Sequence, residues 1–392
     1  AVCVTGLTTV DTATYWSPFG QAVIAAGIVV GGLGVMTLAS ILGFAVSRHL
    51  GLTQRMLATQ ETGTGAMGQI STLLKAVIAT SLTMQALLAA MFLPRFLSMG
   101  IDPVRAVWDA VFMAISVFNN AGFVILPEGL SPHVTDWWML IPIILGTTVG
   151  ATGFPVIMDV AKNLRTPRRW RLHTKLTLST YLILAFVGAL ALALTEWNNP
   201  ATLGAIDTPS KILNAMLAGV NSRSSGLSAL DVGAMQSQTH FVQDILMMIG
   251  GGSASTAGGV KVTTFAVLVL AVIAEARGDR DIETFGRRIP TSAVRLAVAV
   301  SLLGLALVAV SVVLLLSMTH YSLDIILFET VSAFATVGLS TGITPVLPVG
   351  AKYVLIFLMF AGRTGSMTVA AALALRERSR VIRMPEERPI IG

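Results

Sequence analysis

The sequence of 392 residues contains few charged side chains and almost no cysteine. Charged residues make up 12% of it, against about 25% in a soluble domain, and hydrophobic residues make up 54%. The single cysteine, Cys3, excludes a disulfide within the chain and a metal site built from several thiolates. The five histidines are scattered, and none has the spacing of metal ligands. This composition predicts an integral membrane protein.

Apolar runs long enough to cross a bilayer, which takes about 20 residues, recur along the chain. They cover 18–47, 72–97, 136–162, 175–196, 241–275 (interrupted), 294–319 and 351–376. Shorter apolar stretches at 104–118, 209–221 and 323–334 cannot span, and we expect them to be re-entrant half-helices. The long runs contain almost no His, Asp or Glu that could converge on a substrate, so the chain is predicted not to be an enzyme and to have no catalytic residue.

A short motif with one glycine recurs four times. Its copies are Val4-Thr5-Gly6-Leu7, Asn120-Ala121-Gly122-Phe123, Ser224-Ser225-Gly226-Leu227 and Thr336-Val337-Gly338-Leu339. The last three copies each follow one of the short stretches and precede a long apolar run. The pattern predicts an all-α membrane protein with four pseudo-symmetric quarters around one pore, each made of a span, a half-helix, the glycine segment and a second span.

The glycine segments are the predicted ion site. Glycine allows backbone conformations that turn a carbonyl toward the centre, and a ring of carbonyls can hold a dehydrated monovalent cation. The half-helices would direct their negative C-terminal ends at the same cavity. We predict a filter with K⁺ at its four glycines, formed by Val4, Thr5, Gly6, Asn120, Ala121, Gly122, Ser224, Ser225, Gly226, Thr336, Val337 and Gly338.

The side chains around this filter differ between quarters. Because each strand has only one matching glycine, we expect weaker discrimination between K⁺ and Na⁺ than in a filter of four identical two-glycine strands. Arg223 would repel a cation in the path, so we expect its side chain to point backward and to pair with an acid behind the filter. For Asp109 and Glu329, which fall inside half-helices, we expect helix-start or pairing roles.

The first quarter departs from the pattern, since five residues precede Gly6. Its first span and half-helix are absent from this chain, and we expect the natural gene product to begin with roughly 40–60 more residues. The predicted divisions are 1–55 for the first quarter, 70–165 for the second, 172–280 for the third, 292–380 for the fourth, and 381–392 for a C-terminal segment.

The third quarter contains a run of small residues from Gly250 to Gly259. Each glycine in a helix costs up to ~1 kcal/mol relative to alanine, and a broken helix in a membrane must be buried in protein or line a water-filled path. We therefore predict a gating loop here. The predicted gate residues are Gly251, Gly252, Ser253, Ala254, Ser255, Thr256, Ala257 and Gly258, together with Lys261 and Arg363.

Arg363 lies in the last span, where a charge is costly and must face a partner. We expect it to be an electrostatic barrier that donates hydrogen bonds to carbonyls of the loop; the alternative is a carboxylate pair that serves packing alone. Lys261 either joins this site or extends to the membrane surface. The small residues of the other second spans, at Gly31, Gly150 and Gly362, are expected to allow close helix packing.

Basic residues gather in four segments, each after the second span of a quarter. They are Arg48 and Arg55; Lys162, Arg165, Arg168, Arg169, Arg171 and Lys175; Arg277, Arg280, Arg287, Arg288 and Arg295; and Arg376, Arg378, Arg380, Arg383 and Arg388. The positive-inside rule places these segments in the cytoplasm and the glycine segments toward the outside. Topology thus explains the net charge of +6, and no nucleic-acid partner is expected; docking of an acidic cytoplasmic partner stays open.

Four stretches can be compared with a known family: AVCVTGLTTVDTATYWS at the start, SVFNNAGF (116–123), IGGGSASTAGGVKVTTF (249–265) and SAFATVGLSTGITP (332–345). They resemble the Trk/Ktr/HKT superfamily of potassium transporters, most closely the KtrB-type membrane subunit of bacteria, over essentially the whole chain. The resemblance implies four M1–P–M2 units, a one-glycine filter, a gating loop in the third M2, and Arg363 as the family's M2 arginine. It also implies a homodimer with one pore per subunit on a cytoplasmic ring of nucleotide-binding regulatory (RCK/KtrA-type) subunits. The departures are the absent first M1 and half-helix, and Leu227 where an aromatic residue is frequent.

The sequence therefore predicts a K⁺-translocating subunit of the bacterial plasma membrane, either passive or Na⁺-dependent, without an organic cofactor. Two alternatives stay open: a less selective Na⁺/K⁺ channel, and a non-conducting scaffold or regulatory subunit. Ion flux in proteoliposomes would distinguish them. A transporter of organic solutes would show inverted repeats around broken midplane helices, whereas these quarters all run in the same direction.

Overall fold

The computed structural model describes residues 1–49 and 66–365. Its helices and strands are α1 (Thr12–Tyr15), α2 (Pro18–His49), α4 (Ala66–Ser98), α5 (Pro103–Phe118), α6 (Trp137–Thr152), α7 (Phe154–Lys162), α8 (Leu172–Glu196), α9 (Thr208–Asn221), α10 (Ser237–Met248), α11 (Val262–Arg277), β1 (Ile282–Thr284), β2 (Arg287–Ile289), α12 (Thr291–Met318), α13 (Leu323–Phe334) and α14 (Val349–Phe360). Short 3₁₀ turns are η1 (Ser131–His133), η2 (Pro167–Arg169), η3 (Leu203–Ala205), η4 (Val232–Ala234) and η5 (Thr344–Val346), and η6 (Ala361–Gly365) is π-helical.

Parts of the predicted divisions lie outside the described residues. These parts are 50–55 of the first quarter, 366–380 of the fourth and the C-terminal segment 381–392. The predicted cytoplasmic residues Arg55, Arg376, Arg378, Arg380, Arg383 and Arg388 lie there as well.

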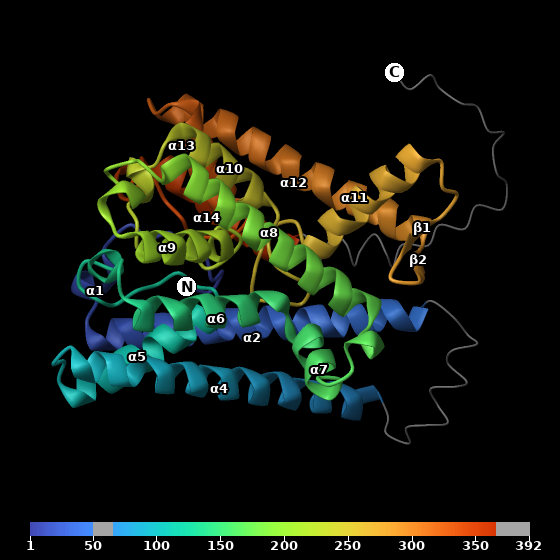
Figure 1. The fold of residues 1–392 in the computed structure, drawn as a ribbon, viewed down its shortest axis with the longest axis horizontal. Helices are drawn as coiled ribbons and strands as arrows, with labels where there is room; N and C mark the ends of the chain where they lie inside the picture. The colour runs from blue at the N-terminus through green and yellow to red at the C-terminus, as the bar shows by residue number, and fades with distance from the viewer. Residues whose placement is uncertain (50–65, 366–392) are drawn as a thin grey trace.

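The helices lie in two groups with their long axes roughly side by side (Figure 1). One group contains α2, α4, α5 and α6, and the other contains α8 to α14. The two largest apolar clusters lie mainly within α4, α5 and α6 and within α8, α12, α13 and α14, while α2 and α11 pack on smaller clusters. Contacts between α6 and α9 join the groups. The β1–β2 hairpin and α7 lie at one end of the bundle, and α1 lies at the opposite end (Figure 1).

Within the described residues, three helical stretches are long and apolar enough to cross a membrane: Leu74–Ser98, Leu172–Glu196 and Thr291–Met318. The bent pair α6 and α7 becomes a fourth when it is counted as one span. The prediction of an all-helical membrane protein is confirmed, apart from the two three-residue strands of the hairpin.

The short helices α5, α9 and α13 coincide with the expected half-helices. Asp102 caps α5 and accepts hydrogen bonds from the amides of Val104 and Arg105, and Pro103 occupies the first helical position. Asp207 caps α9 by accepting from the amide of Ser210, and hydrogen bonding from the Ser210 side chain holds the pKa of Asp207 below its usual value. Local capping signals therefore determine where these helices begin.

The predicted span 136–162 is not straight, and this expectation was wrong. The axes of α6 and α7 meet at 98°, with Gly153 between them at a φ of 92°. Because Pro155 has no amide N–H, the carbonyl of Ala151 lacks its helical donor. It accepts instead from the amide of Gly252 at 2.7 Å, while the amide of Phe154 donates to the carbonyl of Ala254 at 3.3 Å. The bend thus exchanges helical hydrogen bonds for bonds to the segment between α10 and α11.

Candidate functional site

The four glycines of the recurring motif lie side by side in the structure, although they are far apart in sequence. A Cβ added at each of the first three glycines would collide with a carbonyl oxygen of the next segment, that of the residue just before its glycine. A Cβ at the last glycine would collide with the corresponding oxygen of the first segment. The pairs are Gly6 with Ala121, Gly122 with Ser225, Gly226 with Val337, and Gly338 with Thr5. The four segments therefore close a ring in which no side chain fits at the glycine positions.

The backbone of these segments contains left-handed residues that are not glycine. Two residues before the glycine, φ is 53° at Val4, 57° at Asn120 and 50° at Thr336. Such conformations cost about 1–2 kcal/mol per residue and tend to mark functional sites. In the third segment the left-handed residue is Ser225, directly before its glycine, with a φ of 86°. The third strand thus follows a different path from the other three.

Hydrogen bonds anchor the segments to the short helices before them. The side-chain amide of Asn221 in α9 donates to the carbonyl of Leu227 at 2.6 Å, and the hydroxyl of Ser332 in α13 donates to the carbonyl of Leu339 at 2.6 Å. The buried carboxylate of Glu329 accepts from the hydroxyls of Ser340 and Thr344. The negative C-terminal ends of α5, α9 and α13 directly precede the ring, and no segment contains an acidic side chain.

Of the two acids inside the short helices, Asp109 has an expected pairing role, whereas Glu329 bonds to hydroxyl groups and an amide. Asp109 forms an ion pair with Arg105, one turn away in α5, with a nitrogen–oxygen distance of 2.8 Å. Glu329 is held by the hydroxyl groups described above. Within the described residues, no group of three or more His, Cys, Asp or Glu side chains could hold a metal ion.

The following spans approach the ring closely in three quarters. A Cβ at Gly31 would collide with the carbonyl of Val2, one at Gly150 with that of Phe118, and one at Gly362 with that of Phe334. Each of these carbonyls lies four positions before the ring glycine of its quarter. The close packing expected from the small residues is therefore present at equivalent positions.

The third quarter has a loop in place of this helix contact. No helix or strand is assigned between Met248 and Val262, as the run of small residues predicted. The predicted gate residues from Gly251 to Gly258 are buried except for Ser253, which is half-buried. The loop is folded on itself, since the amide of Gly250 donates to the carbonyl of Val260 at 2.8 Å and that of Val262 to the carbonyl of Gly251 at 3.0 Å. We call residues 250–259 the intramembrane loop.

The intramembrane loop contacts the ring segments and both predicted cations. The guanidinium of Arg363 donates to the carbonyl of Thr256, and its second nitrogen donates to the carbonyl of Gly31 at 3.4 Å. The Thr256 hydroxyl lies 2.5 Å from the side-chain amide of Asn120. The ammonium of Lys261 donates to the carbonyl of Ala257. The loop thus joins the second ring segment to the turn η6 after α14.

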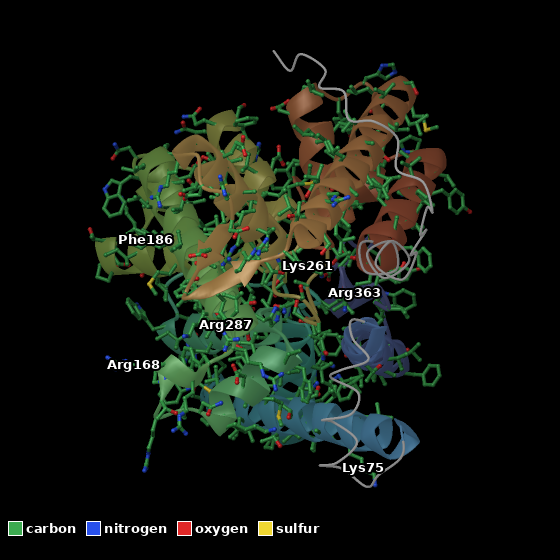
Figure 2. All side chains as sticks on the ribbon, turned by 90° about the vertical axis from the view of Figure 1, so that its right-hand side faces the viewer. Lys75, Arg168, Phe186, Lys261, Arg287 and Arg363 are labelled. Atoms are coloured by element: carbon green, nitrogen blue, oxygen red, sulfur yellow. The ribbon has the colours of Figure 1, made fainter. Side chains whose placement is uncertain are left out.

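Lys261 and Arg363 both lie in the interior of the bundle, as Figure 2 shows from the end that carries the hairpin. The Lys261 ammonium is buried and bonded to the loop, so it does not extend to the membrane surface. Arg363 pairs with no carboxylate among the described residues, which leaves the loop carbonyls as the partners expected for it. It lies in the π-helical turn η6, a geometry common at functional sites.

Arg223 points backward from the ring, but the expectation of an acidic partner was wrong. Its side chain is fully buried and lies over the ring of Tyr181 in α8, with its guanidinium carbon 3.7 Å from the ring centroid. Its Nη1 donates to the carbonyl of Tyr181 at 2.8 Å. A stacked guanidinium needs no carboxylate, because the aromatic face supplies the negative potential. Tyr181 therefore supports the third ring segment from behind.

Replacing Tyr181 by leucine is expected to destabilise the protein by about 2 kcal/mol, the value of a desolvated cation–π contact. Tyr181→Phe retains the aromatic face and is the matched control. Thermal unfolding of the purified chain in detergent measures the difference, with the leucine variant melting below both the phenylalanine variant and the unaltered chain. Equal melting temperatures for the two variants would show that the stacking contributes nothing.

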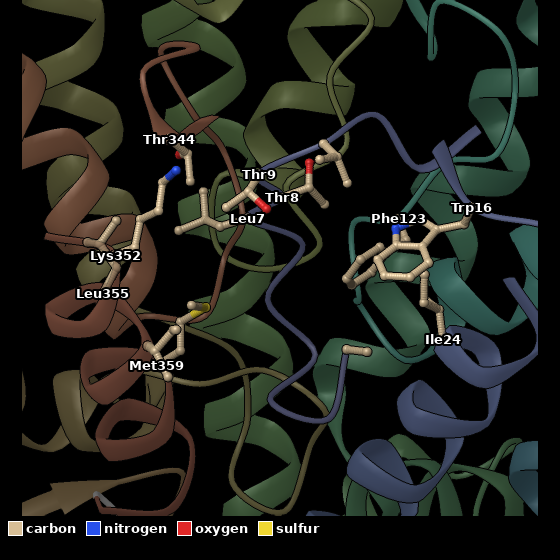
Figure 3. Close-up of a pocket in the computed structure, with 13 residues that line it drawn as sticks. Leu7, Thr8, Thr9, Trp16, Ile24, Phe123, Thr344, Lys352, Leu355 and Met359 are labelled. Atoms are coloured by element: carbon tan, nitrogen blue, oxygen red, sulfur yellow. The ribbon is translucent and has the colours of Figure 1, made fainter. Parts of the chain in front are cut away.

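A pocket of about 320 Å³ opens beside the first ring segment (Figure 3). Leu7, Thr8 and Thr9 lie between α14, which contributes Leu355 and Met359, and the side of α2. The ammonium of Lys352 at its rim donates to the carbonyl of Pro345 at 2.7 Å. The lining residues are mostly apolar.

Sequence reasoning missed two parts of the site. The Gly153-Phe154-Pro155 triplet was a signal for the bend between α6 and α7, because it combines a permissive glycine with a proline that lacks an amide donor. No signal in the sequence pointed to Tyr181, since the aromatic ring that meets Arg223 lies in a different helix.

The chain is similar to known cation transport proteins along its whole length. The sequence model of the TrkH family, described as a cation transport protein, matches residues 1–382. The chain is 37% identical over 392 residues to the Ktr system potassium uptake protein B of Bacillus subtilis, which covers 100% of this chain and 87% of that protein. It is 32% identical over 404 residues to the potassium/sodium uptake protein NtpJ of Enterococcus hirae, which covers 100% of this chain and 88% of that protein.

The fold is also shared with a solved structure. The crystal structure of the potassium transporter TrkH from Vibrio parahaemolyticus superposes with a TM-score of 0.72 at 17% identity, over 96% of this chain and 76% of that chain. The sequence match and the fold agree, and cation transport is not an enzyme class. The chain therefore belongs to the TrkH family of cation transport proteins.

Proposed function

We propose that this chain is a K⁺-translocating membrane subunit whose ion path passes through the ring of four glycine segments. The closed ring carries the proposal: the carbonyl just before each of Gly6, Gly122, Gly226 and Gly338 abuts the glycine of the preceding segment, and the first segment abuts the last. Relatives that align with the whole chain are named potassium uptake proteins, which supports K⁺ as the transported ion.

The chemistry of the ring suits a weakly hydrated monovalent cation. Backbone carbonyls replace the water shell of the ion, and the C-terminal ends of α5, α9 and α13 add negative potential without a buried carboxylate. A left-handed residue two positions before the glycine, as at Val4, Asn120 and Thr336, turns successive carbonyls toward the same side. The different path of the third strand leaves fewer equivalent carbonyls, and this supports modest discrimination between K⁺ and Na⁺.

The intramembrane loop is the proposed gate. It contacts the second ring segment through Thr256 and Asn120, and a Cβ at Gly258 would collide with the Thr336 hydroxyl of the fourth segment. Arg363 holds the loop at the Thr256 carbonyl and places a positive charge next to it. A cation leaving the ring on this side meets both the loop backbone and that charge. Opening therefore requires the loop to leave Arg363.

The remaining parts of the proposal concern the assembly and the membrane. We propose a homodimer in the bacterial plasma membrane with the ring toward the outside, the basic loops in the cytoplasm, and a nucleotide-binding regulatory ring on that face. The clustering of basic residues after each second span supports this orientation. A relative is named a potassium/sodium uptake protein. The proposal therefore has two forms: K⁺ transport that depends on Na⁺, and a channel that selects less strongly between Na⁺ and K⁺.

Flux of K⁺, Rb⁺ and Na⁺ into proteoliposomes containing the purified chain tests this function. K⁺ and Rb⁺ uptake is expected to exceed Na⁺ uptake, and Gly122→Ser or Gly226→Ser is expected to reduce that preference several-fold. At Gly122 the added Cβ would lie 2.5 Å from the carbonyl of Ser225, so the ring must distort. Gly100→Ser is the matched control, because Gly100 has a φ of 77° but no heavy atom within 4 Å of an added Cβ.

Three outcomes would count against the proposal. Unchanged K⁺ kinetics in both ring variants would refute the filter assignment. A loss of preference in the Gly100 variant as large as in the ring variants would assign the effect to backbone strain. A folded chain that conducts no cation would favour the scaffold or regulatory alternative.

A further inference from the structure

The turn between α7 and α8 concentrates positive charge. Six basic residues lie within 162–175, and no acidic residue occurs between Asp159 and Glu196. The six are Lys162, Arg165, Arg168, Arg169, Arg171 and Lys175. We call residues 162–175 the basic turn. All of its basic side chains are exposed except Lys175, which is half-buried.

Among the described residues, Asp159 is the acid that contacts the basic turn. None of its six basic groups forms an ion pair in the described part of the chain. The nearest acid in sequence, Asp159, accepts hydrogen bonds from the Arg171 amide at 2.9 Å and the Thr174 hydroxyl at 2.6 Å. The Asp159 carboxylate is therefore engaged with the backbone and a hydroxyl. Within residues 1–49 and 66–365 these exposed guanidinium groups form no ion pair, although the Asp159 carboxylate lies close enough to Arg171 to interact with it electrostatically.

The basic turn is nonetheless a folded structure. The indole of Trp170 donates to the carbonyl of Asn163 at 3.2 Å, and the ammonium of Lys175 donates to the carbonyl of Arg168 at 3.1 Å. The turn η2 lies between these bonds. A preformed arrangement of cations loses less conformational entropy when it binds an anion than a flexible tail would.

The neighbouring basic segment differs in this respect. Between Arg277 and Arg288 the chain alternates basic residues with Asp279, Asp281 and Glu283. Arg288 pairs with Asp281 at 2.8 Å. The positive charge of that segment is partly neutralised within the protein, so it serves as a control for a general attraction between basic loops and anions.

The basic turn lies at the rim of the bundle, next to an apolar helix face. Along α8 the side chains of Ile183, Phe186, Leu190 and Leu194 are 48–74% exposed and recur every three or four residues. In Figure 2, Arg168 and Phe186 lie along the same edge of the molecule, away from Lys261 and Arg363. The exposed stripe begins about two helical turns beyond Lys175, on the same helix as the end of the basic turn.

We propose that the basic turn binds the headgroup of an anionic phospholipid whose acyl chains lie along this stripe of α8. Clustered basic residues beside a membrane-spanning helix attract anionic headgroups, and a tryptophan at the membrane interface, here Trp170, anchors such a turn. The position at the rim, continuous with exposed apolar residues, favours a lipid over an acidic cytoplasmic protein. Neither the transport reaction nor the glycine ring requires this site.

The site is connected to the intramembrane loop through α7. Asp159 ties the basic turn to α7, and the first residue of α7, Phe154, donates its amide to the carbonyl of Ala254 in the loop. A lipid bound at the basic turn therefore stabilises the helix on which the loop rests.

The test measures lipid binding by native mass spectrometry of the full chain in detergent, with phosphatidylglycerol and phosphatidylcholine as probes. Phosphatidylglycerol is expected to bind preferentially. The triple variant Arg168→Gln, Arg169→Gln, Arg171→Gln is expected to weaken this binding at least tenfold, since each basic residue near an anionic headgroup contributes to the attraction. The matched control, Arg277→Gln, Arg280→Gln, Arg287→Gln, removes the same charge from the neighbouring segment and is expected to bind the lipid as before.

Hydrogen–deuterium exchange locates the site on the folded protein. Phosphatidylglycerol is expected to slow amide exchange in peptides from 159–175, and inorganic phosphate at the same concentration is not. Equal protection by inorganic phosphate would overturn the lipid assignment in favour of a free-phosphate site. Equal loss of binding in both triple variants, or protection at another segment, would also overturn it. Unchanged lipid binding in the triple variant at Arg168, Arg169 and Arg171 would also overturn it, and an acidic protein would then be the favoured partner of the basic turn.

Discussion

Replacing Gly338 by alanine is expected to abolish K⁺ uptake. Gly338 has a φ of 95°, and a Cβ there would overlap the carbonyl oxygen of Thr5. The left-handed backbone alone costs about 1–2 kcal/mol with a Cβ, which a folded protein tolerates. The overlap has a larger effect, because it forces apart the first and last segments where the ring closes. Carbonyls displaced in this way no longer replace the water shell of the ion.

Uptake of Rb⁺ by proteoliposomes measures this effect, with at least a hundredfold loss expected, a barrier increase of about 2.7 kcal/mol. Gly342→Ala is the control, because Gly342 has a φ of 92° and no heavy atom within 4 Å of an added Cβ. It carries the same backbone strain and should conduct normally. Comparable losses in the two variants would assign the effect to strain, and normal uptake by Gly338→Ala would refute the ring.

Deleting residues 253–257 is expected to raise K⁺ flux at least tenfold. The deletion removes Thr256, whose carbonyl accepts from Arg363 and whose hydroxyl contacts Asn120. It also removes Ala254, which accepts from Phe154 at the bend between α6 and α7. Without these contacts the loop no longer obstructs the path below the ring. The expected result is faster uptake with unchanged preference for K⁺ over Na⁺, because the ring itself is intact.

Two point variants separate gating from damage to the fold. Arg363→Gln removes the charge and most hydrogen-bond donors, so it should raise K⁺ flux as the deletion does. Arg363→Lys retains a positive charge on a compact donor, so its K⁺ flux should lie between those of the unaltered chain and Arg363→Gln. Proteoliposome flux and a monodisperse elution profile are measured for each protein. Unchanged or lower flux in a monodisperse deletion variant would show that the loop is structural.

The helical plan of this protein could be predicted from the sequence because its signals are local. An apolar stretch too short to span, ending just before a glycine segment, indicated a half-helix at 104–118, and α5 covers Pro103–Phe118. The four glycine segments were found in the same way, by comparing short windows. The break at 250–259 was also local, since a run of glycine and small residues disfavours a helix in any surrounding.

The partners of these elements could be predicted only in part. Arg363 was expected to donate to carbonyls of the loop, because a charge within a span needs a polar partner. The structure agrees, since its guanidinium donates to the carbonyl of Thr256. The same reasoning was wrong for Arg223, where it suggested a carboxylate. An aromatic face from α8 meets the guanidinium instead.

By itself, the sequence determined the membrane class, the helices, the four glycine segments and the broken third span. Each depends on composition or on residues close together in the chain. Only the tertiary structure decided that the four segments close a ring, that Tyr181 supports the third of them, and that the loop rests in a 98° bend between α6 and α7. Those contacts join residues far apart in sequence. Tertiary packing, and not the local conformational preference of the chain, determines which carbonyl or aromatic side chain each group contacts.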